Sequence, residues 1–267
     1  MFKRIWAMGD LHGSYLPIKN FWDRNKNNIN FSKETDCIIL LGDVGANYFL
    51  NYRDQKFKEK LSEYPFTYFC IRGNHEQRPS LLAQIDIEEW TMEKFFENDV
   101  YVEKKYPEIK YALDEVAIYN ILGENFSYKT LVLPGAYSVD KYYRLANNWN
   151  WFETEQLSTK EMEKGRDLIK NSNNFDLILS HTCPISYEPT DLFLSVVDQS
   201  TVDKTMERYL GEIEYNITYK IWLWGHYHHY RIYPQYQNSQ CIMLSDGKEA
   251  INITEWINDY TQIHNTY

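Results

Sequence analysis

The sequence predicts an α/β protein, because two observations indicate strands and helices that alternate along the chain. The first is a set of short apolar segments, rich in β-branched and aromatic residues, at 5–8, 37–41 and 68–71. The second is a helical pattern in each gap between them, at 17–26 and 48–64. This alternation is typical of βαβ units, whose apolar strands are covered on both faces. We therefore expect the carboxyl ends of the strands to converge on one edge, where ligands bind.

The two early helices carry local signals of their own. Pro17 lies near the first turn of the first, where its fixed backbone angle suits a helix start. In the second, charged residues are interleaved with Phe49, Phe57 and Leu61. Both segments are therefore helical candidates.

The middle of the chain, residues 84–151, has a different pattern, with alternating apolar and polar residues and many Tyr and Trp residues. We expect it to be β-rich with irregular connections. No repeat or linker marks a boundary, so we predict a single domain over 1–267 with an aromatic-rich insertion or specificity region at about 84–151. The alternating stretches are 100–104, 110–120 and 128–133.

The last third returns to alternating elements. Ser158 followed by Glu161 fits a capping box for a helix that runs to about residue 170. The other expected elements are a buried strand at 176–180, a helix at 201–213, a strand at 219–224, and β segments near 231–233 and 240–244.

Composition excludes several classes of protein. The 267 residues carry a net charge of -10, which gives the molecule no general attraction for nucleic acids or anionic membranes. Apolar runs fall far short of the roughly 20 residues that span a bilayer, and Asp10 interrupts the amino-terminal apolar stretch. The four cysteines are widely spaced with no CxxC pair, so we expect reduced, mostly buried thiols. We expect a soluble cytoplasmic protein; its oligomeric state stays open.

Metal-ligand residues cluster where the predicted strands end. Six of the seven histidines fall in four short segments, and most of these segments pair a glycine with an Asp, Asn or His. Carboxylate and imidazole groups without thiolate suit a divalent ion such as Mn, Fe or Zn. The candidate ligands are Asp10, His12, Asp43, Asn74, His181, His226 and His228.

Seven ligands are too many for one tetrahedral ion, but they suit two divalent transition metal ions if one carboxylate bridges them. Asp43 is the natural bridge, because it is the middle carboxylate of the set. Two ions about 3.5–4 Å apart lower the pKa of a shared water and clamp the oxygens of a phosphoryl group. The sequence therefore predicts hydrolysis of a phosphate ester.

The motifs D-x-H, G-D, G-N-H-E, H and G-H-x-H, in this order, resemble those of the calcineurin-like metallophosphoesterase superfamily. The resemblance implies two mixed β-sheets in a sandwich flanked by helices, four layers in the order α/β/β/α. It also implies that Asp43 binds both metals and that His75 is the catalytic imidazole, which protonates the leaving oxygen. By motif position, Asp10, His12 and His228 would bind the first metal, and Asn74, His181 and His226 the second.

The chain departs from the phosphoprotein-phosphatase branch of this superfamily. That branch continues its second motif as G-D-x-V-D-R-G, with an Asp that orients the catalytic His and an Arg that grips phosphate. Here residues 42–47 read G-D-V-G-A-N, without either helper. The paired His226 and His228 are shared with phosphodiesterase-like members. Monoesters and diesters both remain open as substrates.

Three further cations are candidate substrate contacts. Arg72 could meet substrate or pair with a buried carboxylate. Lys141 and Arg144 follow a glycine-rich turn, and either belong to a packed loop with a charged rim or meet the negative charge of the substrate while a Tyr stacks on a base.

Three other residues are expected outside the catalytic roles. Glu76 would support the ligands or act as a first-turn acid. Strand alternation would turn His229 away from the site toward supporting contacts or solvent, and His264 would lie at the surface.

The sequence thus predicts a hydrolase of phosphoric ester bonds, in which a hydroxide bridging two metals attacks a small-molecule or macromolecular phosphate mono- or diester. One alternative substrate is a dinucleotide polyphosphate or a nucleic-acid end. An alternative of another class is a protein-binding scaffold that keeps the fold without catalysis.

Overall fold

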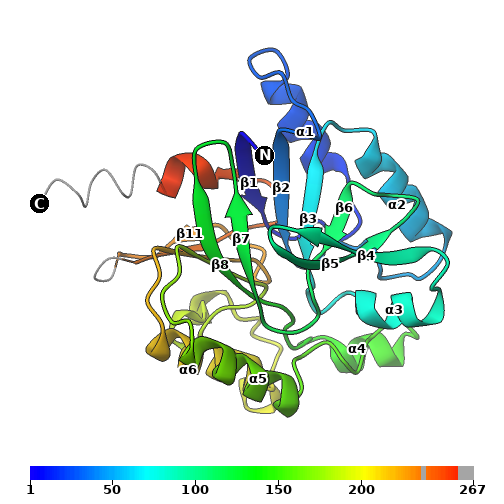
Figure 1. Ribbon diagram of the computed structural model, residues 1–267. Helices are drawn as coiled ribbons and strands as arrows, with labels where there is room; N and C mark the ends of the chain where they lie inside the picture. Colours follow the sequence, from blue (N-terminus) through cyan, green and yellow to red (C-terminus); the bar gives the residue numbers. More distant parts are fainter. Residues whose placement is uncertain (236–238, 258–267) are drawn as a thin grey trace, which may run out of the picture.

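The computed structural model describes residues 1–235 and 239–257 (Figure 1). Two β-sheets pack face to face, α1 and α2 lie against one of them, and α5 and α6 cover the other. This confirms the four-layer α/β/β/α sandwich. His264 lies outside the described residues.

The first sheet has seven strands in the order β13-β1-β2-β3-β6-β5-β4. Its four central strands are parallel, and the outer three pair antiparallel. The three apolar segments predicted near the amino terminus are its strands β1 to β3. The bounds are β1 Arg4–Met8, β2 Asp36–Leu41, β3 Thr67–Ile71, β4 Trp90–Phe95, β5 Asn98–Glu103, β6 Ile109–Tyr111 and β13 Ile251–Asn252.

The second sheet has six strands in the order β11-β12-β10-β9-β8-β7. Here β8, β9, β10 and β12 run parallel, while β7 and β11 are antiparallel edges. The bounds are β7 Ala117–Leu122, β8 Ser127–Leu133, β9 Leu177–Ser180, β10 Ile221–Trp224, β11 Arg231–Ile232 and β12 Gln240–Met243.

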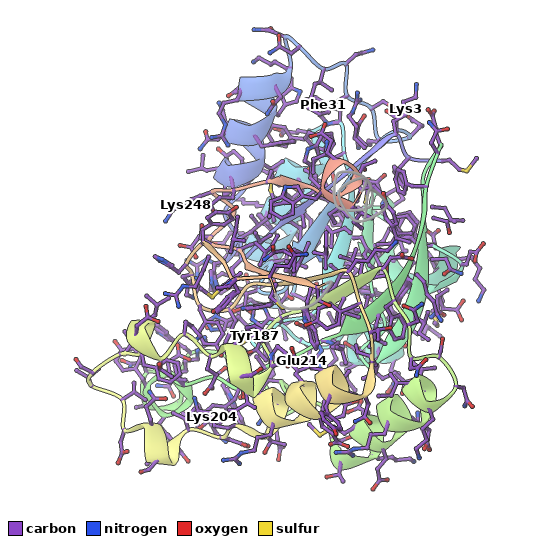
Figure 2. All side chains as sticks on the ribbon, turned by 90° about the vertical axis from the view of Figure 1, so that its left-hand side faces the viewer. Lys3, Phe31, Tyr187, Lys204, Glu214 and Lys248 are labelled. Atoms are coloured by element: carbon purple, nitrogen blue, oxygen red, sulfur yellow. The ribbon has the colours of Figure 1, made fainter. Side chains whose placement is uncertain are left out.

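Alternation along the buried strands creates three apolar layers. In β1, Ile5 and Ala7 face the core between the sheets, whereas Trp6 and Met8 pack against the outer helices. Figure 2 shows the labelled Phe31 well above Tyr187, and the two belong to the two different outer layers. Both faces of each sheet are therefore covered, which explains why the central strands are continuously apolar.

The helices follow the sequence prediction with shifted starts. The helix expected at 48–64 begins only at Tyr52, because the Asn51 side chain accepts a hydrogen bond from the Arg53 amide and caps it. The one expected at 201–213 begins at Thr205, whose amide is bonded to Asp203. The bounds are α1 Leu16–Asn25, α2 Tyr52–Ser62, α3 Pro79–Ile85, α4 Lys141–Ala146, α5 Thr159–Lys170 and α6 Thr205–Asn216, with short 3-10 helices η1 Ile185–Tyr187, η2 Thr190–Leu192 and η3 Gln199–Thr201.

The middle region is β-rich, as predicted, and it is built into both sheets. It supplies β4, β5 and β6 to the first sheet and β7 and β8 to the second. The stretch expected to alternate at 110–120 is divided between β6 and β7, and two short helices, α3 and α4, were not predicted.

Two expectations from composition can be compared with the described residues. None of their helices is long and apolar enough to cross a membrane. Cys37, Cys70, Cys183 and Cys241 are all buried and unpaired, as expected.

Candidate active site

Loops that follow β1, β2, β3, β9 and β10 bring the predicted ligands together at one edge of the sandwich. These residues form three overlapping groups of three. Within each group, every residue offers one donor atom, and the three donor atoms lie within 4.8 Å of one another. The groups are Asp10, His12 and His228; His12, Asp43 and His75; and Asp10, Asp43 and His181. We call this cluster the ligand cage.

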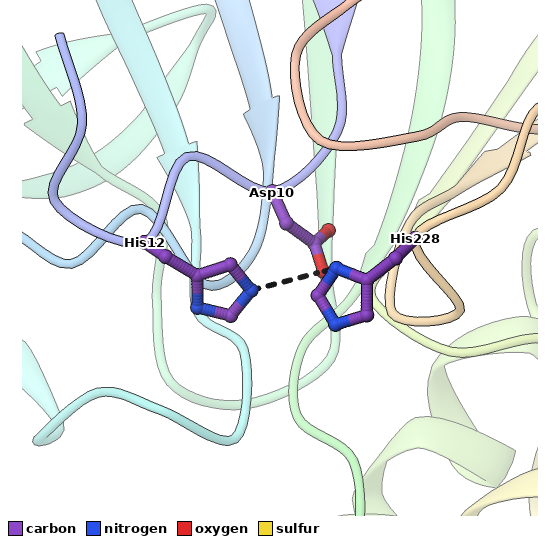
Figure 3. Close-up of side chains that lie close together, drawn as sticks. All are labelled: Asp10, His12 and His228. Carbon is purple, nitrogen blue, oxygen red and sulfur yellow. Dashed lines mark ion pairs between the residues drawn. The ribbon is translucent and has the colours of Figure 1, made fainter. Parts of the chain in front are cut away.

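Asp10 is the centre of the first group (Figure 3). One carboxylate oxygen, Oδ2, lies 3.8 Å from His12 Nε2 and 3.7 Å from His228 Nδ1. The same nitrogen of His228, Nδ1, also hydrogen-bonds the carboxylate of Asp246, so Asp10 and Asp246 both lie beside one atom of this ring. Sequence reasoning missed Asp246, although it follows β12 and precedes a glycine, the same signal that marked the other loops.

Asp43 connects the other two groups. Its Oδ1 lies 3.4 Å from His181 Nε2, and its Oδ2 lies 3.8 Å from His75 Nε2. Burial by itself raises the pKa of the Asp43 carboxyl, but His181 and His75 outweigh burial and hold that pKa well below its ordinary value. Asp43 is therefore a carboxylate at neutral pH, in a position to share its two oxygens.

The ring of His181 is held in one orientation. Its Nδ1 donates to the Leu41 carbonyl at 2.7 Å, so in the neutral ring Nε2 carries a lone pair. That nitrogen faces Asn74 Oδ1 at 2.9 Å as well as Asp43. Burial lowers the pKa of His181, yet Asp43 and Asp10 raise it to about 9. The two carboxylates thus stabilise a positive charge at this position, whether it is a ring proton or a bound cation.

Asn74 is positioned by a buried polar chain. Its Nδ2 donates to Ser138 Oγ at 2.9 Å, which leaves Oδ1 aimed at His181. Ser138 in turn is hydrogen-bonded through both its amide and its hydroxyl to Glu155. The region 84–151 and the loop after it therefore orient a predicted ligand.

His226 lies beside the cage. Its backbone amide donates to both oxygens of Asp10, at 3.1 and 3.2 Å, and its ring packs against that of His181 with centroids 5.0 Å apart. Burial lowers the pKa of His226, so its ring is neutral and free to offer a lone pair. Its ring is not in the three donor groups found among the described residues.

The backbone at the cage is strained. Four of the eight non-glycine residues with positive φ in residues 1–235 and 239–257 are predicted ligands: His12, Asp43, His226 and His228. Such angles are uncommon and concentrate at functional sites. His226 and His228 lie in a turn after β10, so strand alternation, on which we based the role of His229, does not apply. His229 is nevertheless exposed, as expected.

Glycines let the strand ends approach. A Cβ at Gly73 would collide with the carboxylate and the amide of Asp43, and one at Gly225 would collide with the carboxylate of Asp10. Only glycine leaves room for these buried side chains. This is the physical reason that a glycine directly precedes Asn74 and His226.

His75 projects from the loop after β3 and is held from behind by Arg144. Arg144 Nη2 lies 2.7 Å from His75 Nδ1, and its Nε pairs with Asp140 at 2.8 Å. Arginine can only donate, so His75 Nδ1 accepts and the ring proton sits on Nε2, toward Asp43. Burial, together with Arg144 and His12, lowers the pKa of His75 to about 4 despite the opposing effect of Asp43.

The three residues predicted to contact substrate have different environments in the structure. Arg72 is buried, lies 3.1 Å from Asp114, and lines neither cavity beside the cage, so the ion-pair alternative describes it. Lys141 packs its ammonium over the ring of Trp151, 4.0 Å from the centroid, and also lines neither cavity. Arg144 alone of the three lines a cavity, although it is 1% exposed and bonded to His75.

Glu76 supports the backbone of the cage. Its two oxygens accept from the amides of Gly45 and Gly73, at 3.0 and 3.2 Å. Burial raises the pKa of Glu76 to about 8, with a further contribution from Asp43. The residue therefore ties the loops after β2 and β3 together, which is the supporting role expected for it.

Two cavities open on the cage. The larger, of about 570 Å³, is lined by His12 and by Tyr48, Phe49 and Trp149; we call it the aromatic cavity. The smaller, of about 320 Å³, is lined by His226 and His228 and by Leu192, Phe193, Leu194 and Val197; we call it the aliphatic cavity. His75 and Asp140 line both.

The sandwich and the donor atoms at its strand ends define a class of protein, the α/β enzymes whose chemistry depends on bound divalent metals. The family model described as calcineurin-like phosphoesterase matches residues 3–230. The chain therefore belongs to the calcineurin-like phosphoesterase family, as its motifs indicated.

A solved structure agrees on the fold. The structure of TT1561 from Thermus thermophilus matches with a TM-score of 0.54 and 12% identity, over 97% of this chain and 96% of that one. Two further structures match with lower scores. A dimetal phosphatase from Danio rerio matches with a TM-score of 0.48 and 11% identity, over 92% of this chain and 88% of that one. A phosphopantetheinyl hydrolase from Mycobacterium tuberculosis matches with a TM-score of 0.44 and 14% identity, over 92% of this chain and 90% of that one. No curated protein matches the chain.

Proposed function

We propose that the protein is a metal-dependent phosphoesterase that hydrolyses phosphate mono- or diesters with two divalent ions held in the ligand cage. The observation that carries the proposal is the convergence of Asp10, Asp43 and four histidines from five loops within mutual reach of donor atoms. Membership of the calcineurin-like phosphoesterase family supports the same reaction.

The residues fit a pair of metal ions. Two ligands that share an ion, each about 2.1 Å from it, lie roughly 3.0–3.5 Å apart. The spacings of 2.9 and 3.4 Å from His181 to Asn74 and Asp43 fall near this range, as do those of 3.8 and 3.7 Å from Asp10 to His12 and His228. The proposed ligands are Asp10, His12 and His228 for one ion, Asn74, His181 and His226 for the other, and Asp43 for both. When bound, two such ions would supply a water of lowered pKa and neutralise phosphoryl charge.

The chain itself supplies a hydrogen-bond donor. Because Arg144 occupies Nδ1 of His75, the remaining ring proton lies on Nε2, on the side that faces Asp43. A phosphate ester bound there would have a leaving oxygen within reach of this N–H, which can donate a hydrogen bond to that oxygen as the alcohol departs. The side-chain amide of Asn74 would add a dipole beside the bound phosphate.

A cytoplasmic location is proposed on one observation, the four unpaired buried thiols, which persist in reducing compartments.

The experiment is hydrolysis of p-nitrophenyl phosphate and bis(p-nitrophenyl) phosphate by protein loaded in turn with Mn, Fe and Zn, with bound metal measured by elemental analysis. We expect turnover that a chelator abolishes, and about two ions per chain. Asp43→Asn should abolish turnover and reduce the metal content at both positions. Protein that holds two ions and hydrolyses neither ester would contradict the proposal.

A further inference from the structure

Two cavities meet at one reacting centre. The aromatic cavity and the aliphatic cavity share His75 and Asp140, and each also reaches a different side of the ligand cage. His12 lines the first, whereas Asp43, Asn74, His226 and His228 line the second. A phosphorus atom held at the cage would therefore have room for one substituent in each direction.

The two cavities differ in chemistry. The aromatic cavity combines the half-buried rings of Tyr48 and Phe49 and the exposed ring of Trp149 with the side chain of Asn148. The amides of Asn51 and Asn150 also line it, but they hydrogen-bond the backbone. Rings in a cavity wall are suited to stack on a flat ring such as a nucleobase. Trp149 is 55% exposed, and its partner Tyr143 packs edge-on at 5.5 Å.

The aliphatic cavity is formed largely by the segment from η2 to α6, which carries Lys204 at the lower end of the view in Figure 2. Leu194 is 61% exposed at its rim. Beside these apolar groups lies Glu207, 4% exposed, whose Oε1 accepts from Thr182 while Oε2 has no partner among the described residues. A hydroxyl or amine on an otherwise apolar arm would satisfy that atom.

The charges of both cavities disfavour a polyphosphate. Three cations line the two cavities in the described residues: Arg53, Arg144 and Lys204. Arg144 is paired with Asp140, and Lys204 with Glu188. Asp140, Glu188, Asp203 and Glu207 add acidic groups to the same walls. Ions in the cage would neutralise the reacting phosphate, but further phosphates would meet more acidic than basic side chains in these walls, whereas the arms of a phosphodiester carry no further phosphate.

We propose that the substrate is an unsymmetrical phosphodiester, with a nucleoside-like arm in the aromatic cavity and a mainly aliphatic arm in the aliphatic cavity. The inference rests on the proposed phosphoesterase function and narrows it. In the reaction, water supplies the hydroxyl that bonds to phosphorus, one phosphorus–oxygen ester bond breaks with its electron pair on the departing oxygen, and that oxygen takes up a proton. The products are an alcohol and a phosphate monoester.

The test compares three esters that all release p-nitrophenolate: p-nitrophenyl phosphate, bis(p-nitrophenyl) phosphate and thymidine 5′-monophosphate p-nitrophenyl ester. We expect kcat/KM for the nucleoside diester to exceed that for the monoester at least tenfold. A monoester turned over as well as either diester would overturn this inference and leave the phosphoesterase function standing. No turnover of any of the three by metal-loaded protein would instead contradict the function.

Variants assign each cavity to an arm. Trp149→Ala and Leu194→Ala should each lower kcat/KM for the diesters at least fivefold, because each removes contact with a different arm. The monoester has one arm and should respond to at most one of them. The matched controls are Tyr142→Ala, 70% exposed on the neighbouring α4, and Val196→Ala, 90% exposed in the same segment as Leu194; neither lines a cavity. If kcat/KM for the diesters is unchanged in either Trp149→Ala or Leu194→Ala, the assignment is overturned.

A binding measurement gives a readout apart from turnover. Titration calorimetry with thymidine 5′-monophosphate should show at least fivefold weaker binding to Trp149→Ala and unchanged binding to Leu194→Ala. The opposite pattern, or equal effects, would overturn the placement of the nucleoside arm. All four substituted side chains are exposed, so the variants should unfold at the wild-type temperature.

Discussion

Gly73 illustrates how single atoms position the cage. A methyl group at this position would occupy the place of Asp43 Oδ1 and of the Asp43 amide, and neither can withdraw, because both are buried and the amide is backbone. The motif G-N-H-E thus needs its glycine for packing against the preceding loop, not only for the turn.

We predict that Gly73→Ala destabilises the protein by about 1–3 kcal/mol in urea unfolding and loses metal at both positions, because Asp43 is displaced. Gly211→Ala is the control. It lies in the interior of α6, where a Cβ would lie 3.0 Å from Ile185 Cγ2 and 3.7 Å from the Ile185 backbone nitrogen, so the variant's stability should stay within about 1 kcal/mol of wild type. Full metal content in Gly73→Ala would refute this explanation of the glycine.

His75 is the residue whose role the motif indicates most directly. Changing His75 to Ala should leave the metal content unchanged and lower kcat by roughly 10²–10⁴, because a positioned hydrogen-bond donor to the leaving oxygen is lost while the ligands stay. The comparison needs elemental analysis beside the rate. If the His75→Ala variant kept the wild-type kcat, His75 would have no role in the mechanism.

The sequence could identify His75 but not what holds it. The missing Asp of the G-D-x-V-D-R-G motif left the ring without a visible support, and the support is Arg144, 69 positions further along the chain. Nothing local at Arg144 distinguishes a residue that packs behind an imidazole from one that meets substrate. Only the fold of α4 against the loop after β3 decides between them.

At the scale of elements, the α5 amino terminus was predictable because its signal is local. Ser158 and Glu161 form the capping box, and Glu161 also pairs with Arg78 beside α3. The start of α2 was placed too early, because apolar spacing continues through Phe49 while the cap at Asn51 decides the boundary.

The Glu161 contacts predict a pH effect. Burial alone raises the pKa of Glu161, but hydrogen bonds from Arg78 and Ser158 lower it to about 2, below the ordinary 4.5. The stabilisation is therefore present above about pH 4.5 and is lost as the pH falls toward 2. Glu161→Gln should unfold at lower urea concentration than wild type at pH 7, and this difference should shrink below pH 4.5.

Glu163→Gln is the matched control, on the exposed side of the same helix. It should unfold at the same urea concentration as the wild type at pH 7 and at pH 3. A difference between Glu161→Gln and wild type that stayed constant from pH 7 to pH 3 would show that the capping box and ion pair do not hold the pKa down.

At the scale of the whole molecule, the cage joins the two sheets. Asp10, Asp43 and Asn74 follow strands of the first sheet, whereas His181 and His226 follow strands of the second. Ions bound between them would stabilise the packing of one sheet on the other.

We predict that adding Mn to metal-free protein raises the thermal unfolding midpoint, by the equivalent of about 2.7 kcal/mol when free metal is 100 times its Kd. Calorimetry with and without a chelator measures it. Asp43→Asn should show a much smaller increase, because Asp43 belongs to two of the three donor groups. An unfolding temperature independent of metal would argue against ions that span the sheets.

The overall fold was predictable from the ordered motifs, because each one ends a strand and the family resemblance supplies the second sheet. The region 84–151 was harder to interpret. Its alternation indicated strands but not their partners, and β6 and β7, only five residues apart, join different sheets. The cavities could not be predicted, because they form between side chains from segments as distant as 48–53 and 148–150.

The most direct test of the account is anomalous diffraction from a crystal soaked in manganese. The account predicts two peaks about 3.5–4 Å apart, with the Asp43 carboxylate in contact with both. A single peak, or peaks that do not contact Asp43, would contradict it.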